Sequence, residues 1–541
     1  MREIYSLFCD YAQRRCQRAG DIICFGTAKL GDTEEIVKNF FAGIEQLSWN
    51  GGSFAVVEKK ADEVLLACDP ICNIPLFYHV GENAVFVSDN ASLIAEAVGA
   101  PLKESNLVEM LKTGYVTENE TIYQGIYSVM AGEIVCISRT NGTIDRKKYY
   151  DFSFQENGTS GCDVERYSVE YDRCLMELFS RLVERLHGRM VLLFLSAGMD
   201  SRTAAIMLRR LNYQNVVCVS YGKKGNFEAE AAKNIAKNLG YPWYFVEVTT
   251  SLIQKQLEQL TADEWKMLEK GRSIPMVSSI CTIKQLLREN KIAKDAVVVT
   301  GIALDMLCGS LLLNFAPNEW WTKSQLSDFI CYTHYRLHGP KKSAACQKWI
   351  QKLPTVMDAT QVEYESMNWL WRNRVSKFVA NDTASYELAD MDWEQPFWEH
   401  SICEFWSGVP RPLRWKRYLQ KYHMIHMLNP VMGGGGIEEA LEGCENLVSG
   451  KSRLRATLKH YVWYRRLSEF AHDMIHFLSL KASPTSDERE KLLGKLRKVN
   501  RYGIGYDVNS LVAEYACSVH LTDEEMKALH KKAKNILDKE K

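Results

Sequence analysis

The chain has 541 residues, of which 46% are hydrophobic, and its formal net charge is zero. This length is too great for one ordinary domain, so we expect two or three domains, each with its own core. The neutral charge argues against nucleic acid as the main partner, and the basic run at 409–421 predicts a solvated segment or one that faces an active site. No apolar run reaches about 18 residues, so no membrane span is expected.

The first residues and the cysteines predict a cytoplasmic protein. The segment 1–15 lacks the basic start, apolar centre and cleavage site of a signal peptide. The sixteen cysteines form no CxxC pair, and the spacing of Cys68 and Cys72 is poor for a metal, so reduced and mostly buried thiols are expected. His472 and His476 lie one helical turn apart without the glutamate of a zinc protease motif, so we expect a packing or surface role.

Short strand-like segments separated by turn signals dominate the first part of the chain. They include GSFAVVEK, EVLLACDP, IPLFYHV, NAVFVSD and GEIVCIS. This pattern predicts an antiparallel α+β layer domain over residues 1–155. The polar, turn-rich segment 153–165 predicts a linker after it.

Strand and helix patterns alternate from residue 165 onward. Apolar runs that read as buried strands lie at 190–195, 215–222, 241–248 and 295–301, with helical segments between them. This alternation predicts a doubly wound parallel sheet, which binds ligands at the carboxyl ends of its strands. Beyond residue 320 the pattern is largely helical, so we expect an α/β domain over 165–541 with a helical C-terminal part. Four glycines at 433–436 predict a hinge or a flap, and Thr522 with Glu525 predicts the capping box of a terminal helix.

The segment SAGMDS (196–201) joins the first of these strands to a helix. Two hydroxyls, a glycine and a helix N-terminus suit an anion, so Ser196, Ser201 and the N–H groups around Gly198 can hold a diphosphate. A carboxylate beside phosphate requires a divalent cation between them, and Asp200 therefore predicts Mg²⁺. For this segment alone, an ordinary strand-to-helix turn capped by Ser201 is the alternative.

A second carboxylate follows the fourth strand. Thr300 and Gly301 end that strand, and Asp305 comes one turn later. Taken alone, Asp305 would be interpreted as an acid at a helix N-terminus. Together with Asp200 it predicts a site for Mg²⁺ and pyrophosphate.

Five segments of the chain, in the same order, resemble those of the asparagine synthetase family. LSAGMDSR resembles the family's pyrophosphate loop LSGGxDS, and VTGIALDMLCG resembles its TGxGxDExFGG loop. The segment 392–414 resembles the ExRxPFLD region, and 51–89 and 120–135 resemble parts of the glutaminase-type N-terminal domain. The resemblance runs from about residue 50 to residue 415.

The resemblance implies both a fold and a reaction. The fold is an N-terminal nucleophile-type αββα domain followed by an α/β ATP-pyrophosphatase domain. The reaction converts a carboxylate and ATP to an acyl-adenylate and pyrophosphate, and an amine or ammonia then attacks. ATP and Mg²⁺ are therefore expected, since Mg²⁺ and helix N-terminal N–H groups stabilise the charge on the leaving pyrophosphate. The implied partner is a small-molecule or peptide carboxylate, and a homodimer or a biosynthetic protein partner is left open.

The family's site residues can be carried over where the motifs match. By that resemblance Asp200 and Asp305 hold Mg²⁺, and the second strand's end borders the adenine. Glu228 and Glu230 could reach the site, but capping and solvation are the expected roles. The expected ATP and pyrophosphate site consists of Leu195, Ser196, Gly198, Asp200, Ser201, Ser220, Gly222, Thr300 and Gly301.

The N-terminal half departs from the family pattern at the nucleophile. The family uses an N-terminal cysteine with its own α-amine as the base. Here Arg2 follows Met1 and Cys9 is internal, so Cys9 and Cys16 are expected to be structural. We therefore expect that glutamine is not the nitrogen donor.

The second half also departs from the pattern. Ile302 stands where relatives place a residue that handles the nucleophile's proton, and isoleucine cannot do so. Glu399 stands for the PFLD aspartate, and the family's catalytic lysine has no clear counterpart. Glu399, Lys495 and Lys498 are therefore weak catalytic candidates.

Two functions of different class remain open. The first is an AMP-forming amide ligase that does not use glutamine, acting in amidation or in cyclisation of a peptide or small molecule. The second is a catalytically reduced nucleotide-binding or scaffolding subunit, suggested by Ile302 and the missing lysine. A tRNA-modifying enzyme with a similar loop fits less well, because the charge is neutral and paired redox cysteines are absent. The sequence does not choose the carboxylate or the amine.

Overall fold

The computed structural model describes residues 1–27, 52–152, 163–432 apart from 311, 314–318, 336 and 338–348, and 508–535. Most of the predicted linker, the four glycines at 433–436, His472, His476, Lys495 and Lys498 lie outside the described residues. No helix in the described part is both long enough and apolar enough to cross a membrane.

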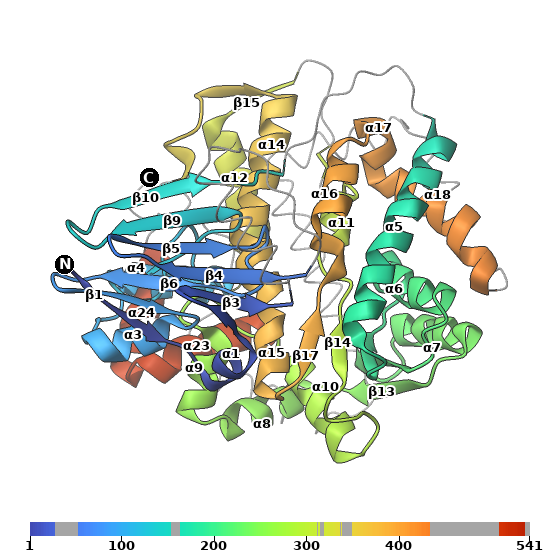
Figure 1. Cartoon of the computed structure of the whole chain (residues 1–541), viewed down its shortest axis with the longest axis horizontal. Helices are drawn as coiled ribbons and strands as arrows, with labels where there is room; N and C mark the ends of the chain where they lie inside the picture. The colour runs from blue at the N-terminus through green and yellow to red at the C-terminus, as the bar shows by residue number, and fades with distance from the viewer. Residues whose placement is uncertain are drawn as a thin grey trace.

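The N-terminal part contains two sheets (Figure 1). One has the strand order β1-β7-β6-β8 and the other β10-β9-β5-β4-β3-β2, and every pair is antiparallel except β1 with β7. The strands are β1 (Glu3–Leu7), β2 (Gln17–Ala19), β3 (Ile22–Gly26), β4 (Phe54–Lys59), β5 (Glu63–Cys68), β6 (Phe77–Val80), β7 (Ala84–Ser88), β8 (Tyr127–Ser128), β9 (Glu133–Ser138) and β10 (Ile144–Lys148).

The central strands of the larger sheet are buried on both faces. Side chains alternate along β4, so that Ala55 and Val57 join the main core while Phe54 and Val56 join a separate apolar cluster. The smaller sheet contributes to the main core, and α3 (Ala91–Val98) packs on β6 and β7. A short α1 (Asp10–Arg15) contacts β3, and α4 is Glu104–Thr113. The expected antiparallel α+β layers are therefore present, and the N-terminal nucleophile fold itself stays a prediction.

The second part is built on one five-stranded sheet in which all strands are parallel. Its order is β13-β12-β11-β14-β17, so that β11 has the next strand in sequence on one side and β14 on the other. Ligands bind at such a reversal of strand order, at the carboxyl ends of the strands. The strands are β11 (Val191–Phe194), β12 (Val216–Gly222), β13 (Trp243–Glu247), β14 (Val297–Val299) and β17 (Asp392–Glu394).

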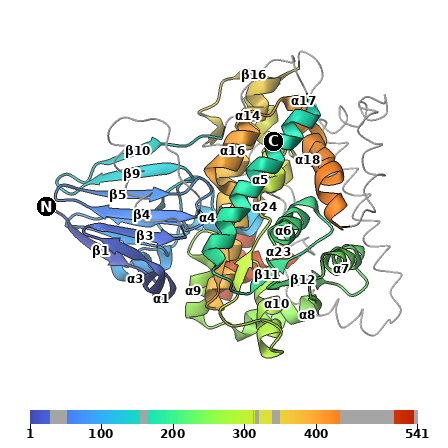
Figure 2. The ribbon, with the colours of Figure 1, turned by 45° about the vertical axis from the view of Figure 1, so that its right-hand side comes forward.

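Helices enclose this sheet, and Figure 2 shows α5, α6 and α7 on one side with α8 and α10 on the other. The predicted strand–helix alternation is thus present. The sequence did not indicate β17, because its three residues, Asp-Trp-Glu, form no apolar run. The helices are α5 (Val164–Leu186), α6 (Met199–Arg210), α7 (Phe227–Leu239), α8 (Thr250–Gln259), α9 (Ala262–Glu269), α10 (Val277–Arg288) and α11 (Leu304–Leu307).

Residues from 320 to 432 are mainly helical, with the short hairpin β15 (Trp320–Thr322) and β16 (Val356–Asp358). The helix α14 continues as a π-helical segment, Leu370–Val379, and a 3₁₀ turn, Ala380–Asp382, leads into α15. The helices of this part are α12 (Lys323–His334), α14 (Ala359–Trp369), α15 (Thr383–Leu388), α16 (His400–Ser407), α17 (Arg411–Arg414) and α18 (Tyr418–His423).

The last described helices return to the N-terminal part. Both α23 (Val508–His520) and α24 (Asp523–Asn535) pack on α4. His520 Nε2 lies 2.6 Å from Glu269 Oε1, which ties α23 to α9 as well. Thr522 and Glu525 form the expected reciprocal bonds at the start of α24. The C-terminal extension therefore contacts both halves, and the division into 1–155 and 165–541 stays a prediction.

Candidate active site

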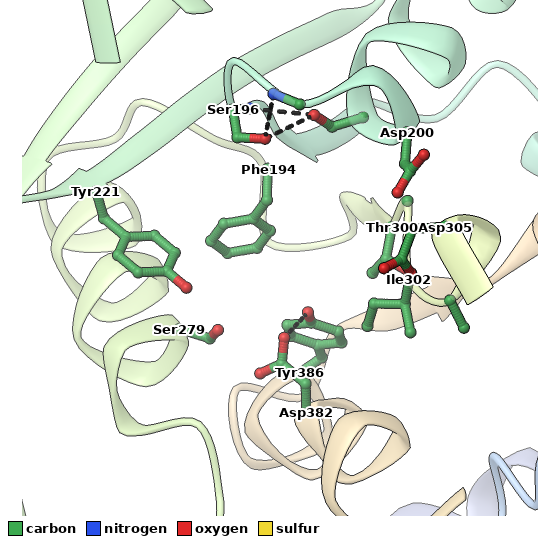
Figure 3. Close-up of a pocket in the computed structure, with 14 residues that line it drawn as sticks. Phe194, Ser196, Asp200, Tyr221, Ser279, Thr300, Ile302, Asp305, Asp382 and Tyr386 are labelled. Atoms are coloured by element: carbon green, nitrogen blue, oxygen red, sulfur yellow. Dashed lines mark hydrogen bonds between the residues drawn. The ribbon is translucent and has the colours of Figure 1, made fainter. Parts of the chain in front are cut away.

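A cavity of about 310 Å³ opens where β11 and β14 end side by side (Figure 3). This is the reversal point of the parallel sheet, where the topology places a ligand. The cavity is lined by Phe194, Ser196, Gly198, Asp200, Ser201, Tyr221, Ser279, Thr300, Gly301, Ile302, Ala303, Asp305, Asp382 and Tyr386. Seven of the predicted site residues are among them, from Ser196 to Asp305.

The loop after β11 folds back on itself through its own hydroxyls. Ser196 N donates to Ser201 Oγ at 3.1 Å, and Gly198 N donates to Ser196 Oγ at 3.1 Å. Gly198 is the N-cap of the twelve-residue α6 and offers no side chain to cap it. The first turn of α6 thus faces the cavity with backbone N–H groups at its positive end, a geometry that favours a phosphate.

The loop after β14 lies directly against this phosphate loop. A Cβ added to Gly301 would lie 2.8 Å from Ser201 N and 3.0 Å from the carbonyl carbon of Asp200. Only glycine permits so close an approach of two backbones. The chain then turns through Ala303, whose φ is +65°, into the short α11 that carries Asp305.

The two predicted metal ligands, Asp200 and Asp305, line the same cavity and influence each other. Burial raises the pKa of Asp200, the nearby Arg417 opposes this, and the charge of Asp305 raises the pKa further. Ser310 Oγ donates to Asp305 Oδ2 at 3.0 Å. Two carboxylates that repel each other in a cavity provide the oxygen ligands that Mg²⁺ prefers.

Arg417 is a neighbour of Asp200 that the sequence did not single out. Its guanidinium pairs with Asp200 Oδ1, and Gln420 Nε2 donates to the same oxygen at 2.8 Å. Both bonds are on Oδ1, so Oδ2 remains for a cation. The basic run 409–421 was the available signal, and this part of it faces the site rather than solvent. Lys416 and Arg417 both have positive φ, at 51° and 62°.

The residues fit a divalent cation that completes its shell with phosphate oxygens. The described residues contain no group of three or more His, Cys, Asp and Glu side chains that could hold a metal by themselves. Mg²⁺ is commonly bound through one or two carboxylates together with substrate phosphates. The Thr300 hydroxyl is buried without a hydrogen-bond partner in the described structure, so it is a further oxygen at this edge.

Three predicted residues do not line the cavity. Leu195 is buried at 2% exposure, and its carbonyl accepts a bond of 2.6 Å from Ser220 Oγ. Ser220 also accepts a bond from Trp243 Nε1 at 3.0 Å. Side chains alternate along a strand, so Tyr221 lines the cavity while Ser220 and Gly222 do not. The end of β12 thus reaches the cavity through Tyr221, and its contact with adenine stays a prediction.

Glu399, a weak catalytic candidate, lies outside this cavity. It is 2% exposed, does not line the cavity, and accepts bonds from Arg181 Nη2 at 2.9 Å and Arg185 Nη2 at 2.7 Å. Arg185 also pairs with Glu394. A buried carboxylate between two guanidinium groups is paired in charge and serves packing.

The thiol of Cys9 is also engaged by a neighbour. Its Sγ lies 2.7 Å from Asp89 Oδ2, and its peptide N–H donates to Asp89 Oδ1 at 2.9 Å. Burial, followed by the charge of Asp89, raises the thiol pKa. Cys9 lies two residues beyond the end of β1, which is paired along its length with β7. A thiol held neutral beside a carboxylate is a poor nucleophile.

Comparison with protein families gives two matches. The family described as asparagine synthase matches residues 175–432, and the glutamine amidotransferase domain family matches residues 24–150. A comparison with curated proteins finds no match.

Solved structures with some likeness include three enzymes. The NH3-dependent NAD synthetase of Campylobacter jejuni is 17% identical over 28% of this chain and 61% of its own, with a TM-score of 0.19. The glutamine phosphoribosylpyrophosphate amidotransferase of B. subtilis is 14% identical over 53% of this chain and 63% of its own, with a TM-score of 0.15. An allosteric regulatory enzyme of purine biosynthesis is 14% identical over 50% of each chain, with a TM-score of 0.14. This chain thus covers less than two thirds of each.

Proposed function

Because an amidotransferase domain and an asparagine synthase domain match the chain in that order, its architecture is that of the asparagine synthetase-like proteins, and from this premise we propose an amide ligase that does not hydrolyse glutamine. The asparagine synthase domain belongs to an ATP-dependent ligase family. The proposed reaction adenylates a carboxylate, releases pyrophosphate, and transfers the acyl group to an amine or ammonia. The proposed substrate is a small-molecule or peptide carboxylate, and Mg²⁺ is the proposed metal.

The observation that carries the proposal is the pairing of the phosphate loop with Asp200 and Asp305 in one cavity at the sheet's reversal point. In the first step a carboxylate oxygen of the substrate bonds to the α-phosphorus, and the bond from that phosphorus to the bridging oxygen breaks. The N–H groups at the start of α6 would stabilise the charge that develops on the leaving pyrophosphate. Mg²⁺, held by Asp200 and Asp305, would supply further positive charge at the same place.

The state of Cys9 supports a nitrogen source other than glutamine hydrolysis in this chain. Its nitrogen is a peptide amide, so it has no free α-amine to act as a base, and burial together with the charge of Asp89 raises the pKa of its thiol. Free ammonia or an amine must then attack the adenylate.

A second candidate function is a nucleotide-binding or scaffolding subunit without ligase chemistry. Two observations favour it: Ile302 lines the cavity with an apolar side chain, and Arg417 occupies one oxygen of Asp200. Both candidates require that ATP bind, and only the ligase requires the formation of pyrophosphate.

Exchange of labelled pyrophosphate into ATP separates these candidates. We expect exchange that depends on one class of carboxylate, drawn from a panel of amino acids, short peptides and sugar acids. Asp305→Asn should abolish the exchange, and Asp145→Asn should not, because Asp145 lies on the exposed strand β10. ATP binding without exchange for any carboxylate would favour the scaffolding subunit.

A further inference from the structure

The wall of the cavity opposite the phosphate loop carries a carboxylate with no cation beside it. Asp382 ends the 3₁₀ turn before α15, and Tyr386, one turn later, donates its hydroxyl to Asp382 Oδ2 at 2.5 Å. The other oxygen, Oδ1, is buried and has no hydrogen-bond partner in the described structure, although the hydroxyls of Ser279 and Ser385 lie near enough to lower the pKa of the carboxyl. Within the described ranges, no Lys, Arg or His side chain pairs with Asp382.

Three aromatic rings line the same cavity as this carboxylate. Phe194 stacks with Tyr386 at a centroid distance of 6.1 Å and an interplanar angle of 24°. Tyr221 meets Phe194 edge-to-face at 5.9 Å and 80°. Burial, followed by the charge of Asp382, raises the pKa of Tyr221 to about 12, so its hydroxyl stays protonated. Figure 3 shows Tyr221, Ser279, Tyr386 and Asp382 across the cavity from Ser196.

A buried carboxylate without a cation beside it, and with one oxygen left without a hydrogen bond, is costly, and a cation with N–H donors lowers that cost. Aromatic faces attract the same cation through their quadrupoles, and the attraction reaches about 2 kcal/mol where water is excluded. A carboxylate or phosphate would be repelled by Asp382. The two sides of the cavity therefore favour ligands of opposite charge.

We infer that Phe194, Tyr221, Ser279, Asp382 and Tyr386, here named the amine wall, bind the acceptor of the ligase as a primary amine in its ammonium form. An ammonium N–H donates to Asp382 Oδ1, and the amine's carbon chain lies against the rings. The inference rests on the proposed function and names the class of its second substrate. The rings offer apolar contact that an ammonium ion cannot use, which favours an organic amine over free ammonia.

The test uses n-butylammonium as the probe, with n-butanol, butyrate and ammonium chloride as matched competitors. Saturation-transfer NMR on the full chain, with Mg²⁺ and a non-hydrolysable ATP analogue present, reports which probe binds. We expect n-butylammonium to bind at least about tenfold more tightly than n-butanol, as one charged contact predicts. Binding of butyrate or n-butanol as tightly as n-butylammonium would overturn the inference.

Variants assign the binding to the wall. Asp382→Asn keeps the shape of the side chain. It should weaken the binding of n-butylammonium at least about tenfold, which corresponds to the loss of one charge-assisted contact. Asp145→Asn, the same change on an exposed strand, should leave it as in the wild type. If Asp382→Asn does not fold, Tyr386→Phe serves as the second variant. It should change the affinity for n-butylammonium without changing the affinity for the nucleotide.

Nucleotide affinity, measured on the same samples, separates the inference from the proposed function. If Asp382→Asn weakens the binding of Mg-ATP as much as the binding of n-butylammonium, then Asp382 recognises the adenine amino group and the inference fails. If the wild type does not bind nucleotide and does not exchange pyrophosphate, the proposed function fails, whether or not n-butylammonium binds.

The wild type alone gives a third readout. Burial raises the pKa of Asp382 to about 6, so the carboxylate is charged above that pH and neutral below it. The probe stays protonated in this range, as lysine does. Its affinity should therefore rise between about pH 5 and pH 7, and Asp382→Asn should flatten the profile while the other carboxylates of the cavity, Asp200 and Asp305, stay in place.

Discussion

Gly301→Ala should impair nucleotide binding through backbone contact rather than through any lost side chain. The new Cβ would lie 2.8 Å from Ser201 N and 3.0 Å from the carbonyl carbon of Asp200. Ordinary contact is about 3.4 Å or more, so the two loops must separate by roughly 0.5 Å. The atoms that must move belong to the first turn of α6, whose N–H groups would hold the phosphates.

The expected magnitude follows from this displacement. Overpacking a close contact costs about 1–3 kcal/mol of stability. A phosphate cradle displaced by up to about 1 Å loses as much as about 10²-fold in function. We therefore expect the Kd for Mg-ATP to rise by about 10- to 100-fold, measured by titration calorimetry, with unfolding by urea as the measure of stability.

Gly198→Ala is the matched control in the same loop. Its Cβ would meet only Ser196 Oγ, at 3.1 Å, and that hydroxyl can rotate away. Its effect on the Kd should be smaller than that of Gly301→Ala, since rotation of the Ser196 hydroxyl disturbs only its bonds with Gly198 N and Ser201 Oγ, each of modest net energy. Equal effects of the two substitutions, or unchanged Mg-ATP binding in Gly301→Ala, would refute the reasoning from close approach.

Three other changes test separate contacts. Arg417→Ala should lower the stability of the nucleotide-free protein by about 1–3 kcal/mol, because Asp200 is left buried beside a like charge. Thermal unfolding with and without Mg²⁺ measures this loss, and added Mg²⁺ should recover part of it. His520→Gln should reduce stability most below pH 6.5, because Glu269 raises the pKa of His520 in the folded state. The stabilisation by the charged His520 is lost as the pH rises through that folded-state pKa. An equal loss of stability at pH 6 and pH 9 would contradict this prediction. Cys9→Ser should leave glutamine hydrolysis at the wild-type level, and a glutaminase activity that disappears in this variant would show that Cys9 is a nucleophile after all.

The sequence was sufficient for those parts of the site that lie close together along the chain. The buried strand, the small polar loop and the helix after it are neighbours in sequence, so Ser196, Gly198, Asp200 and Ser201 could be placed from local pattern alone. Asp305 could be added because parallel strands end at the same edge of a sheet. At the end of β12 it is Tyr221, and not Ser220 or Gly222, that lines the cavity. The sequence could not indicate this, because apolar composition does not define which side of a doubly buried strand faces a ligand.

The opposite side of the cavity could not be predicted in the same way. Ser279 lies on α10, and Asp382 and Tyr386 lie around the start of α15, more than a hundred residues further on. Only the packing of α10 against α15 brings them together. An isolated serine or aspartate within a helical pattern is usually an ordinary cap or surface residue, so nothing local marked them. Arg417 was missed for the same reason, although the basic run around it was visible.

The most direct test of the ligase account is calorimetric titration of the wild type with Mg-ATP, beside Asp200→Ala and Asp305→Ala. We expect the wild type to bind in the micromolar range, since two carboxylates, a cation and a helix N-terminus act on one triphosphate. Both variants should lose most of that affinity, and binding of ATP by the wild type should weaken sharply when Mg²⁺ is removed. A wild type that does not bind Mg-ATP, or variants that bind it equally well, would contradict the account.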